Sequence, residues 1–104
     1  MCIICTTNIR LLQGIKKIDC SYCKNLEKIP VIKGLKELYC VGCVKIKEIP
    51  VIEGLEILNC SECKITEIPV IKGLKKLDCS MCDKLKEIPV IKGLKKLDCS
   101  MCDK

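Results

Sequence analysis

Residues 67–84 read Glu-Ile-Pro-Val-Ile-Lys-Gly-Leu-Lys-Lys-Leu-Asp-Cys-Ser-Met-Cys-Asp-Lys, and residues 87–104 repeat all eighteen positions without a change. Looser copies of the same unit precede these two. Five of the six C-x-x-C pairs show the period, because their first cysteines are 20 residues apart with a single spacing of 19: Cys20, Cys40, Cys60, Cys79 and Cys99. Self-similarity at this period is typical of a solenoid, in which each turn stacks on its neighbours.

The repeat accounts for the whole chain. A length of 104 residues allows one domain, so we predict a single repeat domain over residues 1–104. Residues 1–14 are expected to form a degenerate N-terminal turn. The repeats begin near residues 15, 35, 55, 74 and 94, and the last is truncated.

The pattern inside each unit predicts one short strand. Leu77 and Cys79 alternate with polar residues, which is the period of a strand with one buried face. Pro69 cannot donate to a ladder and therefore lies between strands, and Gly73 precedes the next strand, where the chain must turn sharply. Twenty residues leave no room for a full helix in the return segment.

Written as one unit, the repeat reads L-x-x-L-x-C-x-x-C-x-x-L-x-E-I-P-V-I-x-G. It resembles the leucine-rich-repeat signature L-x-x-L-x-L-x-x-N/C-x-L over residues 15–104. The short return segment with its proline is similar to the compact repeats of bacterial secreted effectors, and the cysteine-rich version looks like the leucine-rich-repeat proteins of giant DNA viruses. The resemblance implies an α/β-type repeat solenoid, a right-handed coil with a parallel sheet on its concave face. The convex segments would be extended or 3-10, with little or no α-helix.

Composition excludes several classes of function. The chain has no histidine, which removes the commonest general base and metal ligand, and no motif places a nucleophile beside a base. We therefore predict a protein that is not an enzyme and carries no cofactor. No apolar run is long enough to span a bilayer, and the N-terminus lacks the features of a secretory signal. These features predict an intracellular, cytoplasmic protein.

The net charge of +6 is spread along the chain among acidic residues. Such a mixture is typical of a solvated surface. Lysines alone supply point charges without bidentate readout, so binding of nucleic acid is not favoured.

The cysteines allow three interpretations. The one that we favour is a reduced packing ladder, because the pairs keep strict phase with the apolar repeat and buried Cys behaves as a small hydrophobe with a weak donor. The second cysteine of a pair would offer its S–H to a neighbouring carbonyl. A thiolate metal site, for zinc or iron, is the alternative, with the spacing of a four-cysteine site at Cys79, Cys82, Cys99 and Cys102. Disulfides between adjacent strands are the third.

Two surfaces are candidates for binding. Exposed apolar residues on the concave face suggest a contact with an unknown protein partner; sequence drift without function is the alternative. The candidate residues on this face are Tyr22, Tyr39, Val41, Ile57, Met81 and Met101. The ends are the second surface, because they lack polar caps and would let copies of the chain associate. The candidate residues there are Ile3, Ile4, Leu94, Leu97, Cys99 and Cys102.

Overall fold

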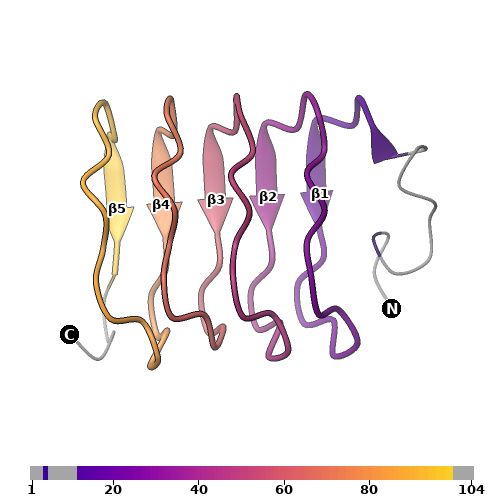
Figure 1. Cartoon of the computed structure of the whole chain (residues 1–104), viewed down its shortest axis with the longest axis vertical. Coiled ribbons are helices and arrows are strands. Elements are labelled where there is room, and N and C mark those ends of the chain that lie inside the picture. The colour runs from indigo at the N-terminus through magenta and orange to yellow at the C-terminus, as the bar shows by residue number, and fades with distance from the viewer. Residues whose placement is uncertain (1–3, 5–11, 100–104) are drawn as a thin grey trace.

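A computed structural model describes residue 4 and residues 12–99. These residues form a solenoid of about four turns, with a five-stranded parallel sheet in the order β1-β2-β3-β4-β5 (Figure 1). The strands are β1 (Lys17–Asp19), β2 (Glu37–Tyr39), β3 (Ile57–Asn59), β4 (Lys76–Asp78) and β5 (Lys96–Asp98). Residues 13–99 contain no helix, and the described part of the chain has no helix that could cross a membrane. The prediction of a repeat coil with a parallel sheet and little α-helix is confirmed.

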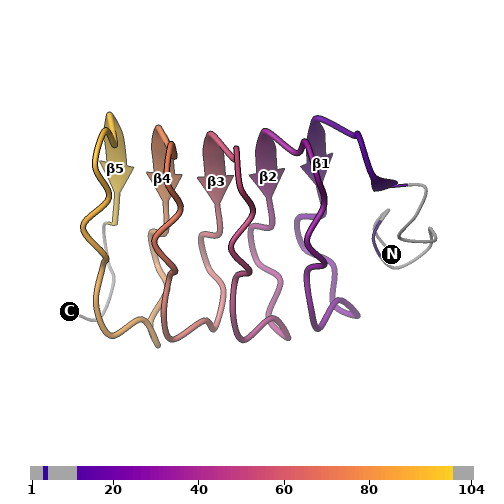
Figure 2. The ribbon, with the colours of Figure 1, turned by 45° about the horizontal axis from the view of Figure 1, so that its top comes forward.

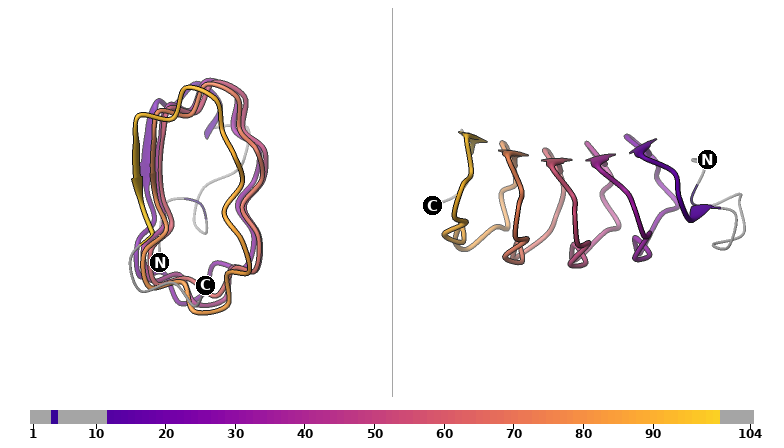
Figure 3. Two further views of the ribbon diagram at one scale, coloured as in Figure 1. Left: turned by 90° about the vertical axis from the view of Figure 1, so that its left-hand side faces the viewer. Right: turned by 90° about the horizontal axis from the view of Figure 1, so that it is seen from above.

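The turns stack with an unchanged register. Leu38 pairs with Leu58 and Leu58 pairs with Leu77, so each strand leucine lies on the equivalent residue of the next turn. The register holds across the repeat of 19 residues as well. Viewed along the solenoid, the turns superimpose, with all strands on one side and the return segments opposite (Figure 3).

A loop after the strand absorbs the missing residue. In the longer repeats the amide of Ile46 donates to the Cys43 carbonyl at 3.3 Å, which closes a turn behind the second cysteine. In the shorter repeat the chain passes from buried Cys63 to buried Ile65 with only one residue between them.

The core is a continuous stack of aliphatic and cysteine side chains enclosed by the coil. Each complete layer contains the same types of residue, and the third repeat is representative: Leu55, Leu58, Cys60, Cys63, Ile65, Ile68 and Ile71. Branched aliphatics of one size fill these thin layers without large rings. Each buried side chain contributes about 1.5–3 kcal/mol before chain entropy is subtracted, so a turn is stable only when its neighbours cover it.

The return segments are extended and carry tight turns. In each of them the isoleucines on either side of the Pro-Val pair point into the core, as Ile49 and Ile52 do, while Val51 between them is exposed. A glycine with a positive φ, such as Gly54 at 88°, then reverses the chain into the next strand. Figure 2 shows the return segments running side by side, on the opposite side of the coil from the sheet.

Candidate functional site

The outer face of the sheet carries the residues that the sequence placed there. Leu38 and Leu58 are fully buried, while their strand neighbours Tyr39 and Ile57 are half-buried and face outward. The predicted phase of the strands is therefore correct. The strand face is this outward surface of the strands together with the turn after each strand.

In the C-terminal half of the strand face, the polar groups form hydrogen bonds with one another. The hydroxyl oxygen of Ser61 lies 2.7 Å from both Asn59 Oδ1 and Asp78 Oδ1, the two acceptors for its single hydrogen, and the hydroxyl of Ser80 donates to Asp78 Oδ1 at 2.8 Å. The amides of Ser61 and Ser80 donate to Asn59 and Asp78 as well, at 3.1 Å each. Polar groups that already have partners offer little to a ligand.

The N-terminal half breaks this polar pattern. In the second repeat Tyr39 and Val41 stand where the third repeat has Asn59 and Ser61. The hydroxyl of Tyr39 donates to Glu37 Oε1 at 2.8 Å, which raises the pKa of the Tyr39 phenol. Lys17 Nζ lies 5.4 Å from the centre of the Tyr39 ring, a cation–π distance. The Tyr39 side chain thus contacts two charged side chains, those of Glu37 and Lys17.

Tyr22 projects from the turn that follows β1. Its φ of 60° is left-handed, as are those of Glu62 and Met81 at the same position of later repeats. Gly42 occupies this position in the second repeat, and the Tyr22 ring lies directly on it: a Cβ added to Gly42 would come within 2.6 Å of the ring. Tyr22 is 64% exposed, and its amide donates to the Val41 carbonyl at 2.6 Å. It therefore presents an exposed aromatic ring in the turn beside Val41.

The candidate residues divide into three groups. Tyr22, Tyr39, Val41 and Ile57 lie on neighbouring repeats of the strand face. Met81 is 49% exposed but lies in the fourth repeat, beside the polar half. Met101 lies outside the described residues.

The described cysteines form a ladder of thiols inside the coil. The eight from Cys20 to Cys82 are buried, and none of them forms a disulfide. In three pairs the second cysteine donates its S–H to the carbonyl of the first cysteine in the preceding turn: Cys43, Cys63 and Cys82 reach Cys20, Cys40 and Cys60 at 2.9, 2.9 and 3.0 Å. The sequence had predicted both the inward direction and the S–H donor.

The thiolate metal site is not assembled in the described residues. Among residue 4 and residues 12–99, no group of three or more His, Cys, Asp or Glu side chains is placed to hold a metal ion. Cys99 is exposed while Cys79 and Cys82 are buried. Cys102, the fourth member of the proposed set, lies outside the described residues, so this alternative stays a prediction.

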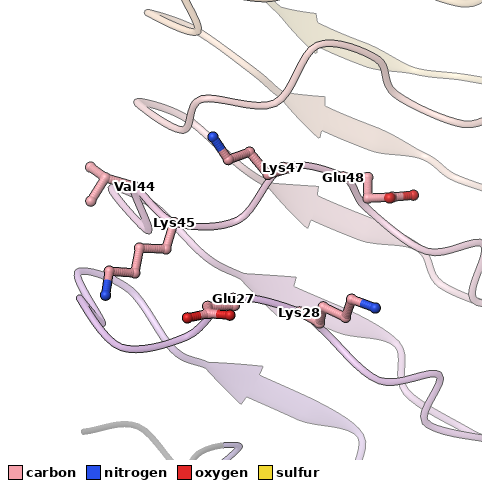
Figure 4. A pocket seen from close by; sticks show the side chains of 6 residues that line it. All are labelled: Glu27, Lys28, Val44, Lys45, Lys47 and Glu48. Atoms are coloured by element: carbon pink, nitrogen blue, oxygen red, sulfur yellow. The ribbon is translucent and has the colours of Figure 1, made fainter.

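Two further surface features were not predicted from the sequence. A stripe of exposed valines runs along the return segments, with exposed fractions of 55%, 52%, 54% and 90% at Val31, Val51, Val70 and Val90. The Pro-Val-Ile motif gave the signal, because only one of two adjacent aliphatics can point inward on an extended segment. A hollow of about 410 Å³ between the first and second repeats is the other feature, and lysine and glutamate side chains line most of it (Figure 4).

β5 is one of the two edge strands of the described sheet. All three residues of β5 are exposed, and Leu97 is 45% exposed where Leu77 is 1% exposed. Leu94 and Ile4 are partly buried against the core, and Cys99 is exposed. Ile3 and Cys102 lie outside the described residues.

Comparisons with models of protein families, with curated proteins and with solved structures find no match for this chain.

Proposed function

We propose that the solenoid is a protein-interaction scaffold whose partner lies against the N-terminal half of the strand face. The observation that carries the proposal is the position of the Tyr22 ring, which lies on Gly42 and is 64% exposed. The half-buried Tyr39, Val41 and Ile57 lie in the same half of the strand face. Aromatic side chains held in place supply contact area at a low entropic cost. A repeat scaffold also fixes the distances between the residues that would contact the partner, because each turn stacks on its neighbours.

The chemistry of the chain supports binding and not catalysis. The titratable groups of the strand face form short internal bonds, such as Asp78 with Ser61 and Ser80. The thiol ladder supports an intracellular location, because its S–H donors require reduced cysteines and such conditions prevail inside cells.

A matched pair of variants tests the proposal. Tyr22→Ser and Glu62→Ser alter exposed residues at the same left-handed turn position of different repeats, so their effects on backbone strain are comparable. Binding of a partner protein from the native host should weaken at least tenfold in Tyr22→Ser, the loss of a contact of about 1.4 kcal/mol or more. The Glu62→Ser variant should bind as the parent chain does. Equal binding by both variants would refute the proposed surface.

Self-association is a second candidate function, favoured by the exposure of Leu97 at 45% on β5. Leu77, the equivalent residue of the preceding repeat, is 1% exposed because the next turn covers it. The segment that forms this cover, residues 87–104, has the same sequence as residues 67–84, which contain Leu77. A second copy of the chain therefore presents apolar layers of the right kind for this edge, either in a closed dimer or in a growing filament.

A further inference from the structure

One side of the β5 backbone is directed away from β4, toward the edge of the described sheet (Figure 1). The Lys96 amide donates to the Lys75 carbonyl at 3.1 Å, and the Asp98 carbonyl accepts from the Cys79 amide at 2.8 Å. Only alternate residues of a strand bond to the same neighbouring strand. The amide and the carbonyl of Leu97 therefore point outward, where they form a template for pairing with another chain.

The apolar layer behind this edge is exposed together with the backbone. Leu97 is 45% exposed, whereas Leu77, its equivalent in β4, is 1% exposed. Leu94 of the same layer is only partly buried, and Cys99 is exposed. Whatever pairs with β5 would thus gain both backbone hydrogen bonds and contact with an apolar layer.

The charges of β5 fit a second copy of β5 that runs in the antiparallel direction. The strand reads Lys96-Leu97-Asp98. When two copies pair about their leucines, each Lys96 lies opposite Asp98 of the other copy, and opposite charges directly across two strands are stabilising. The two-fold axis of this pair is perpendicular to the sheet. Both coils therefore lie on the same side of the joined sheet, and their exposed apolar layers meet.

Head-to-tail pairing of β5 with β1 of another copy lacks this match. β1 (Lys17–Asp19) also begins with lysine and ends with aspartate, and strands of this sheet pair with like residues opposite, as Lys76 does with Lys96. The same register would place lysine opposite lysine and aspartate opposite aspartate, which is destabilising. In addition, Ile18 of β1 is only 2% exposed, so the layer of β1 is already covered.

We propose that the chain forms a closed dimer in which β5 of one copy pairs with β5 of a second copy in the antiparallel direction. The inference rests on the self-association proposed above and specifies its arrangement. The same surface is used by both copies, so assembly stops at two chains. The dimer has one continuous sheet, and the two strand faces lie on the same side of it.

Charge variants of β5 test this arrangement by sedimentation equilibrium under reducing conditions. The parent chain should show a reversible equilibrium between monomer and dimer. Lys96→Asp places two aspartates opposite each other and Asp98→Lys places two lysines opposite each other, so each variant should dimerise roughly tenfold more weakly than the parent. An equimolar mixture of the two variants should dimerise again, because every lysine then lies opposite an aspartate. The double variant Lys96→Asp with Asp98→Lys should dimerise as the parent does.

Lys76→Asp is the matched control, since Lys76 has the same place in β4 and is exposed but does not lie at the edge. It should dimerise as the parent does, and circular dichroism should show that each variant is folded. A parent that stays monomeric at every concentration would contradict self-association itself. A parent that forms species larger than a dimer, or a mixture that associates no better than the single variants, would overturn the antiparallel arrangement while self-association stands.

Discussion

Replacing Cys63 tests whether the thiol ladder stabilises the fold through its hydrogen bonds or only through packing. Cys63 is fully buried, and its S–H donates to the Cys40 carbonyl at 2.9 Å. In Cys63→Ala the side chain loses one heavy atom and the donor together. In Cys63→Ser the sulfur is lost, but a hydroxyl donor remains at the same place.

The magnitudes follow from these contacts. Loss of one buried apolar heavy atom costs about 1 kcal/mol. Removing the partner of a buried carbonyl costs about 1–3 kcal/mol. The Cys40 carbonyl also accepts a longer bond from the Cys43 amide, at 3.4 Å, which places the second cost at the lower end. We therefore expect Cys63→Ala to reduce the free energy of unfolding by about 2 kcal/mol and Cys63→Ser by about 1 kcal/mol.

Equilibrium unfolding in urea under reducing conditions, followed by circular dichroism, measures both values. Cys99→Ala is the matched control: Cys99 has the same place in its repeat as Cys60 and Cys79 but is exposed, so its removal should cost less than about 0.5 kcal/mol. If the serine variant is as unstable as the alanine variant, the S–H bond contributes nothing and the reasoning is refuted.

Three further predictions concern the turns, the polar half of the strand face and the sheet edge. Gly42→Ala should destabilise by about 1–2 kcal/mol, because φ is 69° and the new Cβ would meet the Tyr22 ring; unchanged urea unfolding would contradict this. Although burial opposes it, hydrogen bonds from serine hydroxyls and an amide lower the pKa of Asp78 below 3.8. Its contribution to stability should therefore be present above pH 3.8 and lost as the pH falls through the lowered pKa, and acid unfolding of Asp78→Asn should lack that component. The double variant Leu97→Lys with Ile4→Lys should sediment as a monomer where the parent chain forms oligomers; a parent that is monomeric at high concentration would exclude self-association.

Most of the architecture could be predicted because every repeat carries the same pattern of apolar and polar residues. The alternation of Leu77 and Cys79 with polar residues fixes which strand residues face inward, and the structure confirms that phase. The same argument places each cysteine in register with its equivalent in the next turn. The S–H bond to the preceding carbonyl follows from that stacking and from the donor chemistry of the thiol.

The surface was harder to predict because side-chain direction outside the strands depends on individual φ angles. Strand alternation alone placed Tyr22 with the sheet residues, whereas a left-handed turn presents it beyond the end of β1. The Tyr22 ring can lie against position 42 because that residue is glycine. The two residues are 20 positions apart in the sequence, so the pattern within one repeat does not predict this contact. The exposure of Val51 likewise depends on which of two adjacent aliphatics turns inward.

Site-specific photo-crosslinking tests the central claim, that the partner contacts the N-terminal half of the strand face. A photoreactive residue is placed either at position 22 on this face or at position 51 on the valine stripe, since both native side chains are more than half exposed. In the native host, we expect a discrete protein adduct from position 22 that is absent from position 51. An adduct from position 51 alone would place the partner on the valine stripe and contradict the proposal.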